Sequence, residues 1–318
     1  MISIIIPTYN AADTLYACLE SISNLDHNNY EVIIVDDCST DNSVEIARKF
    51  NVTVIAIKTN FGPAICRNKG AEIAKGDILA FVDSDCEVPR DWLKNFERIF
   101  ETKDVAAISG SYSRFVKRNF VSQFQHYNTC YIRRDIPEYT ENCTSSNLAC
   151  KKDFFFKVGG FPNMRAAEDL QFGSKLSRIA KIYWMGCNGV AHNYKEDVKS
   201  YFKQQKSWAI AIIQSYLSKP SIFLEGGGFS KRNIAFELIL LMLMLVASVF
   251  AVFDSFFLVG VLFFSLLILL INVDFLVFAK KRVSSKFAFL SALLILFRDG
   301  TWLYGLVLGV LKFPFKDL

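Results

Sequence analysis

The sequence predicts an α/β protein in which a mainly parallel, doubly wound sheet is followed by apolar helices. Short apolar runs bounded by turn residues alternate with amphipathic segments, and we assign the runs as buried strands at residues 2–6, 32–35, 52–57, 78–82 and 105–108. Such short alternation is typical of a parallel sheet covered by helices. Polar residues end three of these strands, and after residue 232 the chain changes to long uncharged stretches.

The composition limits the class of protein. With 318 residues and 52% hydrophobic content, the chain is too long for one small domain and too apolar for a purely soluble one. The net charge of +5 is a mild imbalance, so nucleic acid is not an expected partner. Eight cysteines without a C-x-x-C spacing favour reduced, buried thiols over a zinc cluster. The short apolar N-terminus lacks a basic region, so we expect a strand and not a signal peptide.

The strand at 78–82 ends abruptly in Asp83-Ser84-Asp85. Residues two apart in an extended chain point the same way, so both carboxylates are expected to project together. No Lys or Arg lies nearby in the sequence, and a divalent cation with oxygen ligands would offset the repulsion between them. Two solvated turn carboxylates are the alternative interpretation, because a D-x-D pattern is short.

Two further strand ends carry polar residues, which are Tyr9-Asn10 after the first strand and Asp36-Asp37 after the second. Each pair alone would be an ordinary turn signal. In doubly wound sheets, ligands bind beyond the carboxyl ends of the strands. Together with the two aspartates at 83 and 85, these residues predict a binding site at that edge of the sheet.

The second half of this domain has weaker patterns. Residues 111–142 are aromatic and basic, and we expect an irregular segment over the site; an acceptor-binding lid is one interpretation that the sequence leaves open. A strand at 145–149 and a helix at 151–158 follow. Glu168-Asp169 then begins an amphipathic helix, where carboxylates are also expected simply because the helix dipole favours them.

Three stretches near the C-terminus are apolar enough to be membrane spans. About 20 residues of helix cross roughly 30 Å of hydrocarbon, and we place the spans at residues 234–253, 255–279 and 287–311. The third could instead lie along the interface, where Trp302 and Tyr304 would fit.

Basic residues at 231–232 and 280–282 flank these stretches, and positive charges tend to stay in the cytoplasm. We therefore expect a cytoplasmic domain on the inner face of the plasma membrane, with membrane lipids as partners. The expected division is a domain over 1–215, a linker over 216–233 and a multi-pass membrane domain over 234–318.

Eight motifs follow one another in a fixed order: Pro7-Thr8-Tyr9-Asn10, residues 35–41, Arg67-Asn68, Asp83-Ser84-Asp85, Ser146-Asn147, Gly159-Gly160-Phe161, Glu168-Asp169 and His192. Over about residues 1–210, this set resembles family 2 glycosyltransferases, which have a Rossmann-like GT-A fold. Membrane-anchored bacterial and archaeal members carry similar C-terminal spans. The resemblance implies an inverting, metal-dependent enzyme that moves one sugar from a nucleotide-sugar.

The resemblance also implies a role for each matching residue at the donor. Pro7 and Tyr9, with Asn10 beside them, would contact the nucleobase of a UDP-sugar. Asp37 would accept the ring N–H of the base. The remaining donor contacts would come from Arg67 and from Asp83, which would touch the ribose.

For the metal and the base, the resemblance points to the last two motifs and to the D-x-D. Asp85 would hold Mn²⁺ or Mg²⁺ at the diphosphate. His192 could add a ligand or could be an ordinary, partly buried histidine. Asp169 would be the general base that takes the acceptor proton, with Glu168 as a neighbour that positions the loop or a second hydroxyl.

Candidate acceptor contacts are Asn147, Gln205, Trp208 and Arg298. Arg298 would hold an acceptor phosphate, or alternatively form an ion pair with Asp299, since an uncompensated charge in a membrane is costly. Processive members of the family carry a Q-x-x-R-W motif, but residues 204–208 have Ser where Arg would stand. We therefore favour transfer of a single sugar to a glycan acceptor linked to polyprenyl lipid.

Two other classes of protein share part of this pattern. A nucleotidyltransferase also uses paired carboxylates and Mg²⁺, but it would need a glycine-rich phosphate loop after the first strand, and Pro7-Thr8-Tyr9-Asn10 contains no glycine. A non-catalytic membrane scaffold with a degenerate nucleotide-binding domain is the second alternative, and the presence of Asp85 and Asp169 argues against it.

Overall fold

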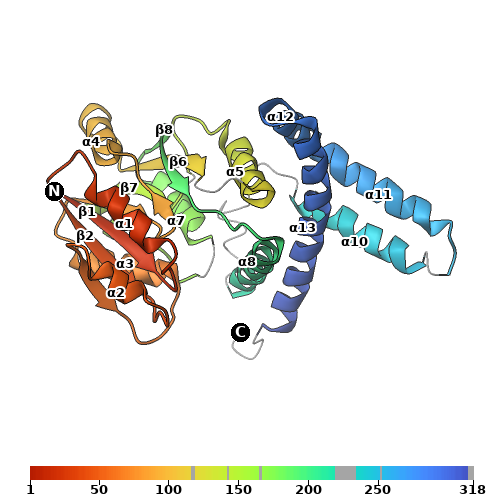
Figure 1. Cartoon of the computed structure of the whole chain (residues 1–318), viewed down its shortest axis with the longest axis horizontal. Coiled ribbons are helices and arrows are strands. Elements are labelled where there is room, and N and C mark those ends of the chain that lie inside the picture. Colours follow the sequence, from red (N-terminus) through yellow and green to blue (C-terminus); the bar gives the residue numbers. More distant parts are fainter. Residues whose placement is uncertain (116–118, 142, 165–166, 219–233, 251–252, 314–318) are drawn as a thin grey trace. The chain divides into compact units, whose positions relative to one another are not determined.

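The computed structural model describes residues 1–115, 119–141, 143–164, 167–218, 234–250 and 253–313. The chain divides into two compact units. The first, which we call the sheet unit, contains Met1–Arg118 and Ile132–Tyr194; the second, the helical unit, contains Asn119–Tyr131 and Lys195–Leu318 (Figure 1).

The sheet unit is built on an eight-stranded sheet with the order β3-β2-β1-β4-β7-β6-β8-β5. Its strands are β1 (Ile2–Thr8), β2 (Tyr30–Asp36), β3 (Thr53–Ala56), β4 (Ile78–Val82), β5 (Cys86–Glu87), β6 (Ala107–Phe115), β7 (Asn147–Lys151) and β8 (Ile182–His192). The first four strands are parallel to one another, and β6 is parallel to β8. By contrast, β7 runs antiparallel to both β4 and β6, and β5 antiparallel to β8. The predicted α/β fold class is confirmed. The antiparallel direction of β7 was not predicted from the sequence.

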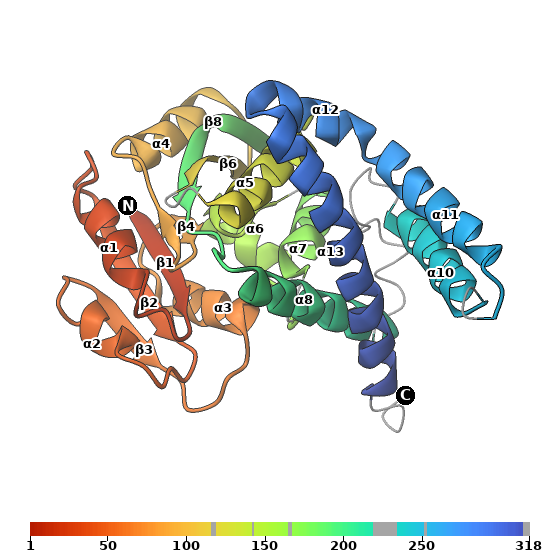
Figure 2. The same cartoon turned by 45° about the vertical axis from the view of Figure 1, so that its right-hand side comes forward.

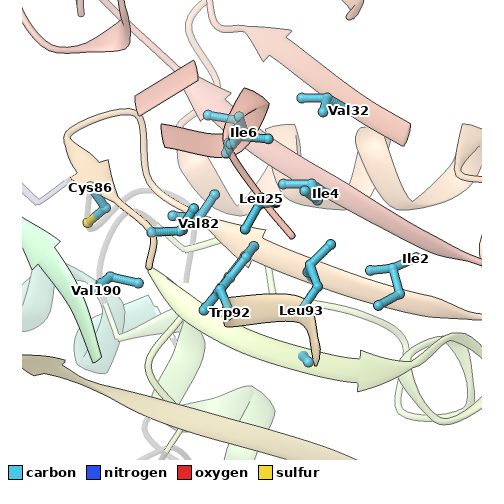
Figure 3. Close-up of a cluster of buried hydrophobic side chains, with 14 of the residues drawn as sticks. Ile2, Ile4, Ile6, Leu25, Val32, Val82, Cys86, Trp92, Leu93 and Val190 are labelled. Atoms are coloured by element: carbon cyan, nitrogen blue, oxygen red, sulfur yellow. The ribbon is translucent and has the colours of Figure 1, made fainter. Parts of the chain in front are cut away.

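Helices pack on both faces of this sheet. They are α1 (Leu15–Ser23), α2 (Ser43–Ala47), α3 (Pro63–Ile73), α4 (Trp92–Thr102), α6 (Lys152–Lys157) and α7 (Glu168–Ser177). Alternate residues of a strand point to opposite faces, so Ile2, Ile4 and Ile6 of β1 join one apolar core while Ile5 joins the other. Figure 3 shows the first core, in which Ile2, Ile4 and Ile6 lie with Trp92 and other buried residues.

The segment 111–142 was expected to be irregular, and that expectation is wrong for most of the described residues. The strand β6 continues to Phe115, and α5 spans Phe120–Arg133. The pairing of β6 with β8 shifts register after Gly110 and again after Tyr112. These irregularities break the two-residue periodicity on which the sequence-based assignment of strands depends.

The helical unit contains α5 up to Tyr131, while the last two residues of this helix, Ile132 and Arg133, belong to the sheet unit. Its other helices are α8 (Val198–Ser218), α10 (Ile234–Phe250), α11 (Phe257–Ile271), α12 (Val273–Arg282) and α13 (Ser285–Leu311). Figures 1 and 2 both show α8 against α13, and α10 against α11. Gly305 and Gly309 allow the first of these contacts, because a Cβ atom at Gly305 would lie 2.7 Å from Cβ of Ala209 and one at Gly309 would lie 2.2 Å from Cγ2 of Ile213.

Of the three predicted membrane spans, the third fits best. Within the described residues, Ser285–Leu311 is the single unbroken helix that is long and apolar enough to cross a membrane, and its 27 residues extend about 40 Å. The second predicted span is broken at Asn272, where α11 and α12 meet at a 60° bend, and the two helices reach the length and apolar character of a span only when taken together. The helix α10 has 17 described residues. Within the described residues, one helix is long and apolar enough to cross a membrane, or two if the bent pair counts as one span, and the predicted multi-pass domain with three spans is not supported.

Candidate active site

The carboxyl end of β1 is fixed to the loop after β2. Pro7 is buried in the strand opposite Val35, and the ring of Tyr9 is 52% exposed. Asn10 has a positive φ of 48°, and its Oδ1 atom accepts a hydrogen bond of 2.8 Å from the backbone N–H of Thr40. Tyr9 is thus presented to solvent at the strand end where the sequence predicted the nucleobase.

Asp37 is buried and organises the loop before α3. Its two carboxylate oxygens accept backbone N–H groups from Phe61 at 2.8 Å and from Gly62 at 2.7 Å. Gly62 has a φ of 95°, which favours glycine, and Pro63 then begins the helix. The predicted hydrogen bond from a nucleobase to Asp37 stays a prediction, because in this structure the carboxylate supports the loop.

Arg67 joins the end of β4 to the start of α7. The guanidinium is 2% exposed; its Nη2 atom lies 2.6 Å from Oδ1 of Asp83, and its Nη1 atom lies 2.8 Å from Oε1 of Glu168. The two carboxylates outweigh the effect of burial and raise the pKa of Arg67, which therefore stays charged. Arg67 is 16 positions from Asp83 and 101 positions from Glu168 in the sequence, and its guanidinium brings these two motifs together.

Glu168 and Asp169 form the first turn of α7 and face different partners. Glu168 is buried against Arg67, and burial, reinforced by the charge of Asp169, raises its pKa to about 7. Asp169 accepts N–H groups from Ser145 at 3.3 Å and from Leu170 at 2.9 Å. Burial raises the pKa of Asp169 as well, while the positive charge of Arg67 opposes the rise. The divergence agrees with the roughly 100° turn between adjacent helical residues.

Asp85 and His192 could hold a metal ion. Oδ1 of Asp85 lies 3.6 Å from Nε2 of His192, because the short strand β5 pairs Cys86 with His192. The Cys86 thiol completes a group whose ligand atoms lie within 4.8 Å of one another. Burial raises the pKa of Cys86, so the thiol stays protonated. The remaining carboxylate oxygen and imidazole nitrogen fit Mn²⁺ or Mg²⁺ better than a thiolate-binding metal.

Tyr112, Arg133 and Ser146 border the same region and were not among the predicted site residues. The Tyr112 ring packs edge-on against His192 with centroids 5.2 Å apart, and its hydroxyl group contacts Oγ of Ser146. The guanidinium carbon of Arg133 lies 4.8 Å from the centroid of the Tyr112 ring. The signals in the sequence were the aromatic and basic character of residues 111–142 and, for Ser146, the Ser146-Asn147 motif.

The acceptor role predicted for Asn147 is not supported, because its side chain is fully buried. Its Oδ1 atom accepts the indole N–H of Trp92 at 2.9 Å. Its amide group donates to the backbone carbonyls of Ser111 at 2.9 Å and Asn188 at 2.7 Å. Asn147 thus connects β7 to β6, β8 and α4, and no surface remains for a substrate.

The other three predicted acceptor contacts belong to the helical unit. Gln205 is buried and accepts the indole N–H of Trp302 at 2.8 Å, whereas Trp208 is 47% exposed. Arg298 is 6% exposed, and its Nη2 atom lies 2.6 Å from Oδ1 of Asp299. The structure thus contains the ion pair that was the alternative to a phosphate contact, although both partners lie on one helix.

Comparison with known proteins identifies the family. The model of "Glycosyl transferase family 2" matches residues 3–161. The chain is 34% identical over 241 residues to "Glycosyltransferase GlyG" of Streptococcus pneumoniae, covering 70% of this chain and 80% of that protein. The chain belongs to glycosyl transferase family 2. It is therefore a glycosyltransferase, and the two alternative classes, a nucleotidyltransferase and a non-catalytic scaffold, are not supported.

Two other relatives are matched over shorter parts of their length. An "Uncharacterized glycosyltransferase" of Haemophilus influenzae is 35% identical over 189 residues, which are 55% of this chain and 62% of that protein. The "UDP-Glc:alpha-D-GlcNAc-diphosphoundecaprenol beta-1,3-glucosyltransferase WfaP" of Escherichia coli is 38% identical over 124 residues, 38% of this chain and 49% of that protein. The chain thus spans about half to two thirds of these two relatives.

A solved structure supports the fold. "Mannosyltransferase PcManGT from Pyrobaculum calidifontis in complex with GDP-Man and Mn2+" aligns with a TM-score of 0.58 and 20% identity, over 98% of this chain and 86% of that one. At this identity the likeness concerns the fold alone. It confirms the GT-A architecture that the motifs implied.

Proposed function

We propose that this protein is an inverting, metal-dependent glycosyltransferase that moves one sugar from a UDP-sugar to a polyprenyl-linked glycan at the cytoplasmic face of the plasma membrane. The observation that carries the proposal is the bridge formed by Arg67. Its guanidinium binds Asp83 at the end of β4 and Glu168 beside Asp169, and so connects the donor-binding edge of the sheet to the candidate base.

The donor would lie along the carboxyl ends of β1, β2 and β4. The exposed ring of Tyr9 is available to stack on the nucleobase, and the loop that Asp37 supports also presents Phe61, which is 45% exposed. Asp83 keeps 31% of its side chain exposed while its Oδ1 atom is bound to Arg67. Its other oxygen could therefore accept a ribose hydroxyl group.

Asp85 and His192 would hold the metal ion at the diphosphate. A bound Mn²⁺ or Mg²⁺ would supply Lewis-acid stabilisation of the charge that develops on the departing diphosphate. The Cys86 thiol contacts this carboxylate, since its Sγ atom lies 3.7 Å from Oδ1 of Asp85. Asp85 and His192 are partly exposed, with 34% and 17% of their side chains accessible, so an ion could reach both.

Asp169 would take the proton of the acceptor hydroxyl group as that oxygen attacks the anomeric carbon. In the same displacement, the bond from that carbon to the diphosphate oxygen breaks, and the anomeric configuration inverts. Burial raises the pKa of Asp169, which brings it closer to the range that suits a general base. The N–H of Ser145 holds one carboxylate oxygen in place.

The lipid-linked acceptor and the membrane location rest on two further observations. The relative WfaP is named for an acceptor with a diphosphate and an undecaprenol lipid. The helix Ser285–Leu311 is long and apolar enough to cross a membrane. With Lys280, Lys281 and Arg282 on the cytoplasmic side, the domain over residues 1–215 would face the cytoplasm.

The test is a transfer assay with the full chain in detergent. A panel of nucleotide-sugars is incubated with lipid-linked acceptors and MnCl₂, and products are detected by mass spectrometry. We expect one added sugar, from a UDP-sugar, with an inverted anomeric linkage in the NMR spectrum. Absence of transfer from every UDP-sugar, or a retained configuration, would contradict the proposal. Activity of the Asp169→Asn variant equal to wild type would contradict the mechanism.

A further inference from the structure

Arg133 is a half-buried cation that forms no ion pair with a described residue. Among the residues that the structure describes, no carboxylate lies within 4.0 Å of its guanidinium nitrogens; the next residue, Arg134, pairs instead with Asp135 at 3.1 Å. The guanidinium lies over the Tyr112 ring, 4.8 Å from its centroid. Its one hydrogen bond to a described residue runs from Nη2 to Oγ1 of Thr144 at 3.3 Å. A guanidinium has five N–H donors, so most remain available.

Three consecutive residues connect Arg133 to the catalytic groups. Thr144 accepts the hydrogen bond from Arg133, the N–H of Ser145 donates to Oδ2 of Asp169, and Oγ of Ser146 contacts the hydroxyl group of Tyr112. Consecutive Cα atoms are about 3.8 Å apart, so the Arg133 contact and the Asp169 contact lie on neighbouring residues of one loop. The positive charge of Arg133 also lowers the pKa of Asp169, which agrees with this proximity.

The chemistry of the site favours a phosphate group. A planar guanidinium that stacks on an aromatic ring keeps its fork of N–H donors directed outward and binds phosphate with two parallel hydrogen bonds. Thr144 is buried, and its hydroxyl group accepts a hydrogen bond from Nη2 of Arg133. This contact restricts the guanidinium, so less conformational entropy is lost when a ligand binds. The donor diphosphate would be bound through the metal ion at Asp85 and His192. Arg133 instead contacts the loop whose Ser145 N–H binds the candidate base Asp169.

We propose that Arg133, supported by Tyr112 and Thr144, binds the phosphate of the acceptor's lipid diphosphate and thereby places the acceptor sugar at Asp169. This inference rests on the proposed function, because it assumes an acceptor that carries phosphate. No donor contact is assigned to Arg133. The same chemistry could come from the donor diphosphate, so the experiment must separate the two sources.

The first measurement is binding, which does not depend on transfer. Geranyl diphosphate is titrated by calorimetry into the full chain in detergent, with UDP and MnCl₂ present. We expect Arg133→Gln to weaken this binding roughly 10- to 100-fold, the usual range for a lost charged hydrogen bond. Arg133→Lys, which keeps the charge but not the fork, should lose less. The matched control is Arg134→Gln, because Arg134 pairs with Asp135 on the surface and should leave binding unchanged.

Titration of UDP and MnCl₂ alone identifies the source of the phosphate and reports whether the variant is folded. Arg133→Gln should bind UDP as the wild-type chain does. A parallel loss of UDP affinity would place Arg133 at the donor and overturn the inference. Equal affinity of wild type and Arg133→Gln for geranyl diphosphate would also overturn it, as would failure of the wild-type chain to bind this probe.

The second measurement is transfer to two acceptors with the same sugar, one linked to a short prenyl diphosphate and one to a plain alkyl chain. Arg133→Gln should lower kcat/KM for the first by roughly 10- to 100-fold and for the second by little. Equal losses for both acceptors would contradict a phosphate contact. If the wild-type chain transfers no sugar but geranyl diphosphate binding still depends on Arg133, the proposed function fails while the phosphate site stands.

Discussion

The two carboxylate pairs of the sheet unit differ in their surroundings. Asp83 and Asp85 follow β4 and keep 31% and 34% of their side chains exposed. Glu168 and Asp169 begin α7, where burial raises the pKa of both groups and brings that of Glu168 to about 7. A metal ion in solution can reach a carboxylate that is partly exposed. A carboxylate in a low-dielectric environment binds a proton more easily.

Arg67 connects the two pairs, because it contacts one member of each. Its guanidinium neutralises part of the charge of Asp83 and of Glu168, and leaves Asp85 and Asp169 without a direct ion pair to it. These two are the residues to which we assign the metal ion and the proton. One buried cation can thus hold one carboxylate of each pair in place. The other carboxylate of each pair, Asp85 or Asp169, is then available to bind a metal ion or a proton.

The largest effect should come from the exposed pair. Asp85→Asn removes the only carboxylate of the candidate metal group formed by Asp85, Cys86 and His192. Lewis-acid stabilisation is worth several kcal/mol, so we expect turnover to fall by roughly 10³-fold or more. The assay measures sugar transfer across a range of MnCl₂ concentrations, with circular dichroism to show that the fold is kept.

Asp77→Asn is the matched control, because Asp77 is 93% exposed and lies before β4 instead of after it. It should leave transfer unchanged. Full activity of the wild-type protein in excess EDTA, or an Asp85→Asn variant with normal metal dependence, would remove the metal from the proposal.

The next largest effect should come from the buried pair. Asp169→Asn is nearly isosteric and can keep the contact with Ser145, but it removes the proton acceptor. Loss of a general base usually costs 10²-fold or more, so turnover should fall by roughly that factor. The affinity for UDP, measured by calorimetry, should barely change, because no donor contact is assigned to Asp169.

This prediction separates the two residues of the pair. If Asp169→Asn kept nearly normal turnover and Glu168→Gln lost it, the base would be Glu168. A loss of UDP affinity in Asp169→Asn that matched the loss of turnover would instead indicate that the substitution damages the donor site.

The exposed pair was predictable from the sequence because its strand is buried on both faces. Five apolar residues followed by Asp83-Ser84-Asp85 identify β4 and its carboxyl end. The parallel strands β1 and β2 were recognisable for the same reason, and they led directly to the edge where Tyr9 and Asp37 lie. Local patterns suffice where each strand carries its own signal.

The surroundings of the buried pair depend on contacts between distant parts of the chain, which local patterns do not encode. Arg67 and Glu168 are 101 positions apart, and Trp92 and Asn147 are 55 apart. The sequence predicted Asn147 as an acceptor contact, but the fold shows that its amide is hydrogen-bonded to Trp92, Ser111 and Asn188 inside the domain. The bend at Asn272 was not predicted for a related reason, because hydropathy depends on composition and does not show where a helix bends.

A third prediction alters the support of the buried pair without touching a carboxylate. A Cβ atom at Gly173 in α7 would lie 2.1 Å from the backbone oxygen of Glu141, so Gly173→Ala must displace the loop that carries Ser145. We expect a stability loss of about 1–3 kcal/mol, typical of overpacking. Turnover should fall by roughly tenfold as the hydrogen bond to Asp169 weakens. Thermal unfolding and kcat give the two values.

Gly186→Ala serves as the control, since Gly186 is exposed and its added Cβ would meet only the Trp184 indole nitrogen at 3.4 Å. It should change neither quantity. Normal turnover in a folded Gly173→Ala protein would show that the loop does not position the base.

The smallest effect concerns pH and Glu168. Transfer requires Asp169 to be ionised, and burial raises its pKa, so the rate should increase as pH rises through the acid limb of the profile. Glu168→Gln removes a negative neighbour and leaves Arg67 with one carboxylate fewer to neutralise, so the pKa of Asp169 should fall. The acid limb of kcat/KM should therefore move to lower pH by up to about one unit, with turnover at high pH reduced only a few-fold.

The control is Glu101→Gln, because Glu101 is an exposed residue of α4 and its loss changes the net charge by the same amount. This variant should leave the acid limb in place. A limb that stays fixed or moves to higher pH in Glu168→Gln would show that the two carboxylates of α7 do not titrate together, and the comparison with the exposed pair would then rest on Asp169 alone.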